Sequence, residues 1–208
     1  MWLNRIEAGR ALAPQLKNLS GPDTVILGIP RGGVIVAAEA AAILGLPLDV
    51  LITRKLGSPG NPELGIGAIA PDAVAIIDED LVRYLNVTDD YLDKEKTRQM
   101  EELRRREKLY RGDAAESDWS GKTLVLIDDG IATGATIKAA ALYAKRRGAK
   151  RVIIAAPVAP PDTPERLRGA ADGFIFLDTP EYFQSVGAFY QDFSQTTDEE
   201  VREALAAR

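Results

Sequence analysis

The sequence predicts an α/β fold with a mainly parallel sheet and helices on both of its faces. Three observations support this prediction. Short runs of branched apolar residues recur along the chain, each about the length of one strand. Helical segments alternate with these runs, as in βαβ proteins. At two points a buried strand leads into a glycine-containing loop and then directly into a helix. With 208 residues, the chain fits one domain, 1–208, with a small appendage.

The N-terminal third supplies the first elements of this fold. Apolar residues at Ile6, Leu12 and Leu16 among alanines and charges predict an amphipathic helix over Asn4 to Leu16. The elements expected next are a strand at Thr24 to Ile29, an alanine-rich helix at Val34 to Leu44 and a strand at Leu48 to Thr53.

Leu56 to Gly67 interrupts the alternation, because it contains four glycines and two prolines. We expect this stretch to lack regular structure and to form a lid over a site. Glu63 is its only ionisable side chain and is a weak candidate for an acid or base.

The middle of the chain predicts a strand or short hairpin and then two helices. Ala68 to Ile77 is the strand or hairpin, and Asp78-Glu79-Asp80 is interpreted as a polar turn in which Asp80 caps a short helix. Asp90 to Arg111 predicts a long helix with six acidic and eight basic residues. Interleaved charges favour a solvated helix over a nucleic-acid site. Its length leaves room for contact with a partner subunit, so a homodimer is one arrangement we consider.

The last third repeats the strand and helix pattern. Thr197 to Glu200 is a capping box that opens the final helix. The other elements expected here are strands at Thr123 to Ile127, Arg151 to Ala156 and Gly173 to Leu177, and helices at Ile137 to Arg147 and Thr163 to Arg168.

Composition excludes several classes of chemistry. The chain has no cysteine and no histidine, which removes disulfides, thiolate nucleophiles, most zinc sites and histidine-based triads. A net charge of −5 argues against nonspecific nucleic-acid binding. Arg5, Glu7 and Arg10 lie in the first turns, so no signal peptide is expected, and no apolar stretch approaches membrane-spanning length. We therefore expect a cytoplasmic protein that binds neither nucleic acid nor membranes.

The most informative stretch follows the buried strand Thr123 to Ile127. Two carboxylates, Asp128 and Asp129, come first, and a loop of small residues with two hydroxyls then leads into a helix. Loop amides and a helix N-terminus aimed at one point can hold a phosphate without a lysine. Adjacent carboxylates suit a ligand with hydroxyl donors near its phosphate, such as a ribose 5-phosphate, or a magnesium ion. The alternative is a polar turn with an aspartate capping the helix.

Val125 to Thr136 resembles the phosphoribosyl-diphosphate signature of the type I phosphoribosyltransferases, in which two acids precede a Thr-Gly-x-Thr phosphate loop. The resemblance implies that Asp128 and Asp129 hold the ribose hydroxyls. Gly130 departs from the aliphatic residue usual after the second acid. Ala132 stands where the hypoxanthine-guanine enzymes have Asp, so the base-facing role of that position is open. The residues that the resemblance assigns to the substrate are Gly130, Ile131, Ala132, Thr133, Gly134, Ala135 and Thr136.

Two further loops carry candidate residues for a diphosphate. Arg31, Gly32 and Gly33 follow the first strand and resemble the pyrophosphate loop of the same family, although a tight packing turn is the alternative. Arg54 and Lys55 follow the second strand, where family members carry Arg-Lys before a mobile loop. Solvated surface charge is the alternative for this pair.

Five aromatic residues gather between Pro180 and Phe193, after the last strand. We expect a hood over the sheet edge, within residues 178–196, although ordinary core packing is the alternative. The pattern resembles the tail of purine phosphoribosyltransferases. This resemblance implies that Phe183 stacks on a base and that Asp192 is a ligand of Mg²⁺. No lysine follows the Arg151 to Ala156 strand, where 6-oxopurine enzymes carry one, so the base remains open.

The resemblance covers nearly the whole chain, and it implies a phosphoribosyltransferase. The expected reaction joins a nitrogenous base to C1 of 5-phosphoribosyl 1-diphosphate and releases diphosphate, with Mg²⁺ as cofactor. The catalytic residues would be Asp128 and Asp129, whose charges favour a positive C1, and Lys55, which would neutralise the departing diphosphate. The alternative function is a regulator that binds phosphoribosyl diphosphate or a nucleotide without chemistry. A scaffold with decayed loops is disfavoured because both loops are intact.

Overall fold

A five-stranded parallel sheet forms the centre of the molecule. The computed structural model describes residues 1–112 and 117–207. The strands lie in the order β2-β1-β6-β7-β8, and every neighbouring pair is parallel. Their bounds are β1 Thr24–Gly28, β2 Leu48–Val50, β6 Thr123–Ile127, β7 Arg151–Val158 and β8 Gly173–Asp178. The predicted mainly parallel α/β fold is confirmed.

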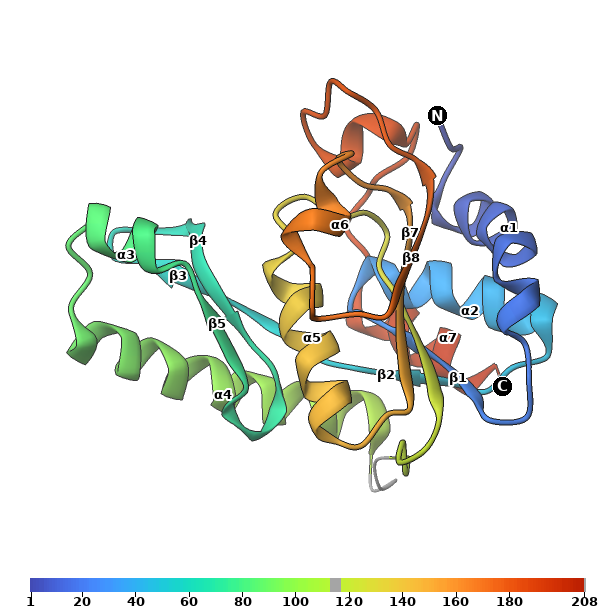
Figure 1. Cartoon of the computed structure of the whole chain (residues 1–208), viewed down its shortest axis with the longest axis horizontal. Helices are drawn as coiled ribbons and strands as arrows, with labels where there is room; N and C mark the ends of the chain where they lie inside the picture. The colour runs from blue at the N-terminus through green and yellow to red at the C-terminus, as the bar shows by residue number, and fades with distance from the viewer. Residues whose placement is uncertain (113–116, 208) are drawn as a thin grey trace.

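Both faces of this sheet are buried under helices (Figure 1). Side chains alternate along each strand, so Val25 and Leu27 of β1 join one core while Ile26 joins the other. The first core contains side chains of α5, and the second contains those of α1, α2, α7 and the end of α4. The bounds of the helices beside the sheet are α1 Arg5–Leu16, α2 Gly32–Leu44, α5 Ala135–Arg146, α6 Thr163–Arg166 and α7 Asp198–Ala206. The predicted capping box of α7 is present at Thr197 and Glu200.

A separate antiparallel sheet extends to one side of the central sheet (Figure 1). It has the order β3-β4-β5, with bounds β3 Arg54–Ser58, β4 Asn61–Ile69 and β5 Ala75–Ile77. The prediction that Leu56 to Gly67 lacks regular structure was therefore wrong. A Cβ at Gly57 would lie 2.8 Å from Cα of Pro62, and one at Gly65 would lie 2.7 Å from Cδ of Lys55. Glycine is needed here for close strand approach.

The β3–β4 hairpin is fastened to the long helix α4, Asp89–Arg111. The buried Glu95 carboxylate accepts a hydrogen bond of 3.2 Å from the Gly57 amide, and the Tyr91 hydroxyl donates one of 2.9 Å to the Gly57 carbonyl. Both backbone groups of Gly57 are thus held by α4. The far end of the hairpin, around Asn61 to Leu64, is exposed along its length.

One short helix connects β5 to α4. Helix α3, Glu79–Tyr84, is capped by Asp78, whose carboxylate accepts a 2.9 Å hydrogen bond from the Leu81 amide. The prediction that Asp80 is the cap was wrong, because the helix begins earlier than expected. Asp80 instead pairs with Arg83 on the exposed face of α3.

The C-terminal half of α4 packs against the central sheet. Leu103 and Tyr110 are buried in the second core, and the guanidinium of Arg111 lies 3.2 Å from the buried carboxylate of Asp49. Helix α4 therefore runs from the antiparallel sheet to the main core (Figure 1). Among the helices of residues 1–112 and 117–207, none is both long and apolar enough to cross a membrane.

The segment after β8 covers the carboxyl edge of the sheet beside the N-terminus (Figure 1). It contains the short helix η3, Val186–Phe189. The Trp2 amide donates to the Phe189 carbonyl at 2.8 Å, and the Gln191 amide donates to the Trp2 carbonyl at 2.8 Å. We use the name hood for residues 178–196, and the N-terminal segment holds it in place.

Candidate functional site

Two loops lie next to each other at the carboxyl edge of the parallel sheet. Gly28 at the end of β1 pairs with Ile127 at the end of β6, so the two chain segments leave the sheet level with one another. One continues through 30–33 into α2 and the other through 128–134 into α5. Ligands of open parallel sheets bind at this edge.

Gly32 and Gly33 allow the first loop to rest directly on the two aspartates. A Cβ at Gly33 would lie 2.7 Å from Cα of Asp128, and a Cβ at Gly32 would lie 2.8 Å from Cγ of Asp129. No side chain fits at such distances, so glycine is what brings the loops together. The peptide bond between Pro30 and Arg31 is cis. The structure therefore places the predicted diphosphate loop against the predicted ribose acids.

The two carboxyl groups are held in an environment that opposes their charge. Burial raises the pKa of Asp128 well above its ordinary value, and repulsion from Asp129 adds to this effect. Burial also raises the pKa of Asp129, but the guanidinium of Arg5 opposes that rise. The Asp129 amide donates a 2.9 Å hydrogen bond to the Asp128 carboxylate. A cation or a set of hydroxyl donors would stabilise the charged forms.

Arg5 is a site residue that the sequence reasoning missed. Its Nε donates to the Asp129 carboxylate at 2.7 Å, and its Nη1 donates to the Ser194 carbonyl at 2.8 Å. The guanidinium carbon lies 4.1 Å from the centre of the Phe193 ring, a cation–π distance. Arg5 thus ties the acid loop to the hood. No local sequence signal marks this contact, because 124 residues separate its partners.

The loop before α5 has the form of an anion site. Gly134 has φ of +81° and no side chain, so among the described residues no capping side chain accepts from the first amides of α5. Thr133 is exposed and Thr136 is half-buried. The guanidinium of Arg166 donates to the carbonyls of Ala132 and Thr133 at 3.0 and 3.1 Å. Arg166, which the sequence reasoning also missed, therefore fixes the backbone of this loop through its carbonyls.

Gly130 and Ile131 do not offer side chains to a ligand. Ile131 is 2% exposed and belongs to the core, so its backbone is the part available to a ligand. A Cβ at Gly130 would lie 2.8 Å from a methyl carbon of Val186 in the hood. Because Gly130 has no side chain, Val186 of the hood can pack directly against the acid loop. The Tyr190 hydroxyl strengthens this contact by donating to the Asp129 carbonyl at 2.6 Å.

The predicted diphosphate cations lie on different elements. Arg31 is the N-cap residue of α2, and its guanidinium is 3.8 Å from the Asp198 carboxylate. Arg54 donates to the Gln99 side chain at 3.0 Å. Lys55 donates to the Glu63 carbonyl at 2.6 Å and lies 3.5 Å from its carboxylate.

The hood residues predicted to contact a ligand have partners within the hood. Phe183 stacks on Phe189 with ring centres 5.6 Å apart and an angle of 21° between the rings. The Asp192 carboxylate is exposed and accepts a 2.9 Å hydrogen bond from the Ser194 amide. Within the described part of the chain, no recorded contact joins Asp192 to the two central aspartates.

The donor set of the acid loop fits a magnesium ion bound together with a substrate. Among the described residues, no group of three or more acidic side chains could hold a metal alone. Magnesium commonly takes one or two carboxylates and completes its shell with water and substrate phosphates. Asp128 and Asp129 supply such a pair, and their raised pKa values show that positive charge beside them would be stabilising.

A large groove of about 1130 Å³ lies between α1, α2 and α7, and its lining includes Arg5 and Asp192. Its lining includes no residue of 128–136. The groove therefore lacks the loop amides that could form an anion-binding concavity at the start of α5.

The fold and the paired loops define the class of this protein. Residues 2–187 match the family model of the phosphoribosyl transferase domain, and the chain belongs to that family.

Individual relatives support the same assignment. Two Mycobacterium tuberculosis proteins, from strains CDC 1551 and H37Rv, carry a provisional phosphoribosyl transferase name. Each is 46% identical to this chain over 198 residues. The aligned part is 95% of this chain and 45% of the relative. The chain thus spans about half the length of these relatives. The crystal structure of TT1426 from Thermus thermophilus is 41% identical with a TM-score of 0.81, covering 99% of this chain and 98% of the other. The Aquifex aeolicus AQ2163 structure is similar in fold alone, at 13% identity and a TM-score of 0.51, covering 98% of this chain and 85% of the other.

Proposed function

We propose that the chain transfers the 5-phosphoribosyl group of 5-phosphoribosyl 1-diphosphate to a nitrogenous base. One observation carries this proposal: the Gly32-Gly33 loop lies directly on the Asp128-Asp129 pair, at the edge where α5 presents its first amides. A single ligand with a phosphate, ribose hydroxyls and a diphosphate has groups for all three features.

Each feature has a role in binding. Thr133, Gly134 and Thr136 would hold the 5-phosphate through loop amides and hydroxyls. Asp128 and Asp129 would accept hydrogen bonds from the ribose hydroxyls, and Mg²⁺ would be held by these carboxylates and would supply positive charge to the diphosphate. The Gly32 and Gly33 amides would face that diphosphate. Asp192 stays an alternative metal ligand in this proposal.

The chemistry follows from the charges around C1. The bond from C1 to the diphosphate oxygen breaks, and its electron pair leaves with the diphosphate. A base nitrogen then forms the new bond to C1 with its lone pair, and a proton on that nitrogen passes to solvent. Between these events C1 carries positive charge, which nearby carboxylates stabilise. Arg31 and Lys55 would stabilise the departing anion, and Lys55 would first have to exchange its contacts with Glu63.

A base would lie under the hood in this arrangement. Phe183 is half-buried and already stacked on Phe189, so one further planar ring could extend the stack. The hood is attached to the acid loop through Val186 and Tyr190, which keeps a bound base close to C1.

The test is diphosphate release from 5-phosphoribosyl 1-diphosphate with Mg²⁺ against a panel of purine and pyrimidine bases. We expect base-dependent release with at least one member. The matched control is the double variant Asp128→Asn and Asp129→Asn, which keeps size but removes charge and should lower release by at least about 10-fold. Tight binding of the ligand without release for any base would contradict the proposal.

A further inference from the structure

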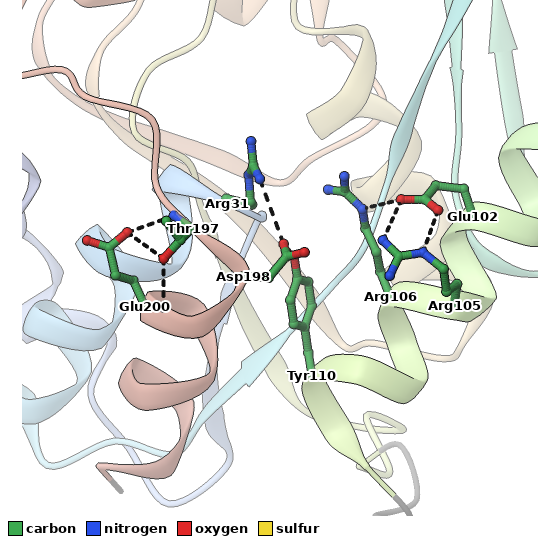
Figure 2. A network of polar contacts seen from close by, with 8 residues as sticks. All are labelled: Arg31, Glu102, Arg105, Arg106, Tyr110, Thr197, Asp198 and Glu200. Atoms are coloured by element: carbon green, nitrogen blue, oxygen red, sulfur yellow. Dashed lines mark hydrogen bonds and ion pairs between the residues drawn. The ribbon is translucent and has the colours of Figure 1, made fainter.

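A cluster of arginines lies beside Arg31, where α4 and α7 meet the first loop (Figure 2). The Asp198 carboxylate, in the first turn of α7, lies 3.8 Å from the Arg31 guanidinium. The same carboxylate accepts a 2.5 Å hydrogen bond from the hydroxyl of Tyr110 on α4. Three elements distant in sequence thus meet at one carboxylate.

Helix α4 adds two more arginines, which share Glu102 as a partner. Arg105 and Arg106 each lie within 2.8 Å of a Glu102 carboxylate oxygen. They differ in exposure, because the Arg105 side chain is 56% exposed and that of Arg106 only 17%. Figure 2 shows the guanidinium groups of Arg31 and Arg106 beyond the hydroxyl end of Tyr110, Arg31 on the left and Arg106 on the right.

The same charged groups act on the pKa values of Tyr110 and Arg54. Burial raises the pKa of Tyr110 to about 12, and the hydrogen bond to Asp198 adds to the rise, while the positive charges of Arg106 and Arg31 oppose it. Burial lowers the pKa of Arg54, and the charge of Arg106 lowers it further. Arg31 and Arg106 therefore both lie near Tyr110, where Asp198 and Glu102 supply the negative charge beside them.

We propose that Arg106 of α4 is a binding residue for the diphosphate end of the ligand and that Asp198 is the partner of Arg31 only while that ligand is absent. This inference rests on the proposed function, because it assigns further residues to the same site. A diphosphate carries several negative oxygens, and the Arg106 guanidinium would add a fixed positive charge to those of Arg31, Lys55 and Mg²⁺.

The Arg31–Asp198 pair has the properties of a replaceable contact. Its separation of 3.8 Å exceeds hydrogen-bond length, and the two side chains are 26% and 33% exposed. Such pairs contribute little free energy. A diphosphate with Mg²⁺ would form shorter, charge-assisted bonds to Arg31, while Tyr110 would keep Asp198 in place through its hydroxyl.

The experiment compares two ligands in three variants by calorimetric titration in the presence of Mg²⁺. The ligands are 5-phosphoribosyl 1-diphosphate and ribose 5-phosphate, which differ in the diphosphate. The variants are Arg106→Gln, Asp198→Asn and Arg105→Gln. Arg105→Gln is the control, because Arg105 lies on the same helix as Arg106 and also pairs with Glu102. Melting curves establish that each variant is folded.

We expect Arg106→Gln to weaken binding of the diphosphate ligand by about 10-fold and to leave ribose 5-phosphate unchanged. Arg105→Gln should weaken binding of the diphosphate ligand much less, because the Arg105 side chain is 56% exposed and its charge is better screened. Asp198→Asn should strengthen binding of the diphosphate ligand by about two- to fivefold, because Arg31 loses a competing anion. A gain of affinity cannot result from damaged folding, so this arm tests the proposal independently.

The outcomes separate this inference from the proposed function. Equal behaviour of Arg106→Gln and Arg105→Gln, or weaker diphosphate binding in Asp198→Asn, would overturn the inference. If the unmodified protein bound neither ligand, the proposed function itself would fail.

Discussion

Gly130 gives the sharpest test of how the hood is joined to the site, because the structure predicts what one added methyl group would meet. In Gly130→Ala the new Cβ would lie 2.8 Å from one methyl carbon of Val186 and 3.1 Å from a methyl carbon of Val158. The first distance is too short, so the hood must move or Val186 must change its rotamer. Overpacking of this kind typically costs about 1–3 kcal/mol of unfolding free energy.

Part of that cost is offset by the unfolded state. Replacing glycine by alanine reduces the entropy of the unfolded chain and contributes about 0.4–1 kcal/mol to stability. We therefore expect a net loss of up to about 2.6 kcal/mol, and each kcal/mol lowers the melting temperature by about 2–4 °C in a chain of this size.

A double-mutant cycle with Val186→Ala isolates the contact. Removing the two methyl groups of Val186 leaves room for the new Cβ, whereas the entropy effect is the same in both backgrounds. Thermal unfolding should show that Gly130→Ala costs at least about 1 kcal/mol less when Val186 is alanine. An equal cost in both backgrounds would refute the proposed contact between the hood and the acid loop.

Three further predictions concern charge and stacking. Burial raises the pKa of Asp128 above its ordinary 3.8, so the folded state keeps a proton that the unfolded state loses. The free energy of unfolding should therefore fall as the pH rises from about 4 through the folded pKa. In Asp128→Asn, denaturation at a series of pH values should show a weaker dependence of this free energy on pH. Asp49→Ala removes the buried carboxylate beside Arg111 and should lower the free energy of unfolding, measured by urea denaturation, by about 3–5 kcal/mol. A loss below about 1 kcal/mol would show that the Asp49–Arg111 pair does not contribute to stability. Phe183→Ala should weaken nucleoside monophosphate binding about threefold to tenfold with a small change in melting temperature, whereas a large loss of stability with normal binding would make the Phe183–Phe189 stack structural.

Local patterns were enough to predict the strands of the parallel sheet and the two loops. A buried strand such as Thr123 to Ile127 and the glycines of the loops are visible in a few consecutive residues, and the structure places them as predicted. Parallel strands deliver their loops to one edge, so the meeting of the Gly32-Gly33 loop with the aspartates was also predictable.

Contacts between distant segments were not predictable in this way. The glycines between Leu56 and Gly67 indicated an irregular loop, but their role is to let β3 approach β4 and α4 closely. Arg5 and Arg166 carry no motif and become site residues only through the fold, which brings them to the Asp129 carboxylate and to the loop carbonyls. The function of Gly130 likewise depends on Val186, which lies far along the chain.

A crystal structure with 5-phosphoribosyl 1-diphosphate and Mg²⁺ would test the central claim most directly. We expect the 5-phosphate at the start of α5 between Thr133 and Thr136, the ribose hydroxyls on Asp128 and Asp129, and the diphosphate on the Gly32 and Gly33 amides. Binding of the ligand in the groove between α1, α2 and α7, with the acid loop unoccupied, would contradict the claim.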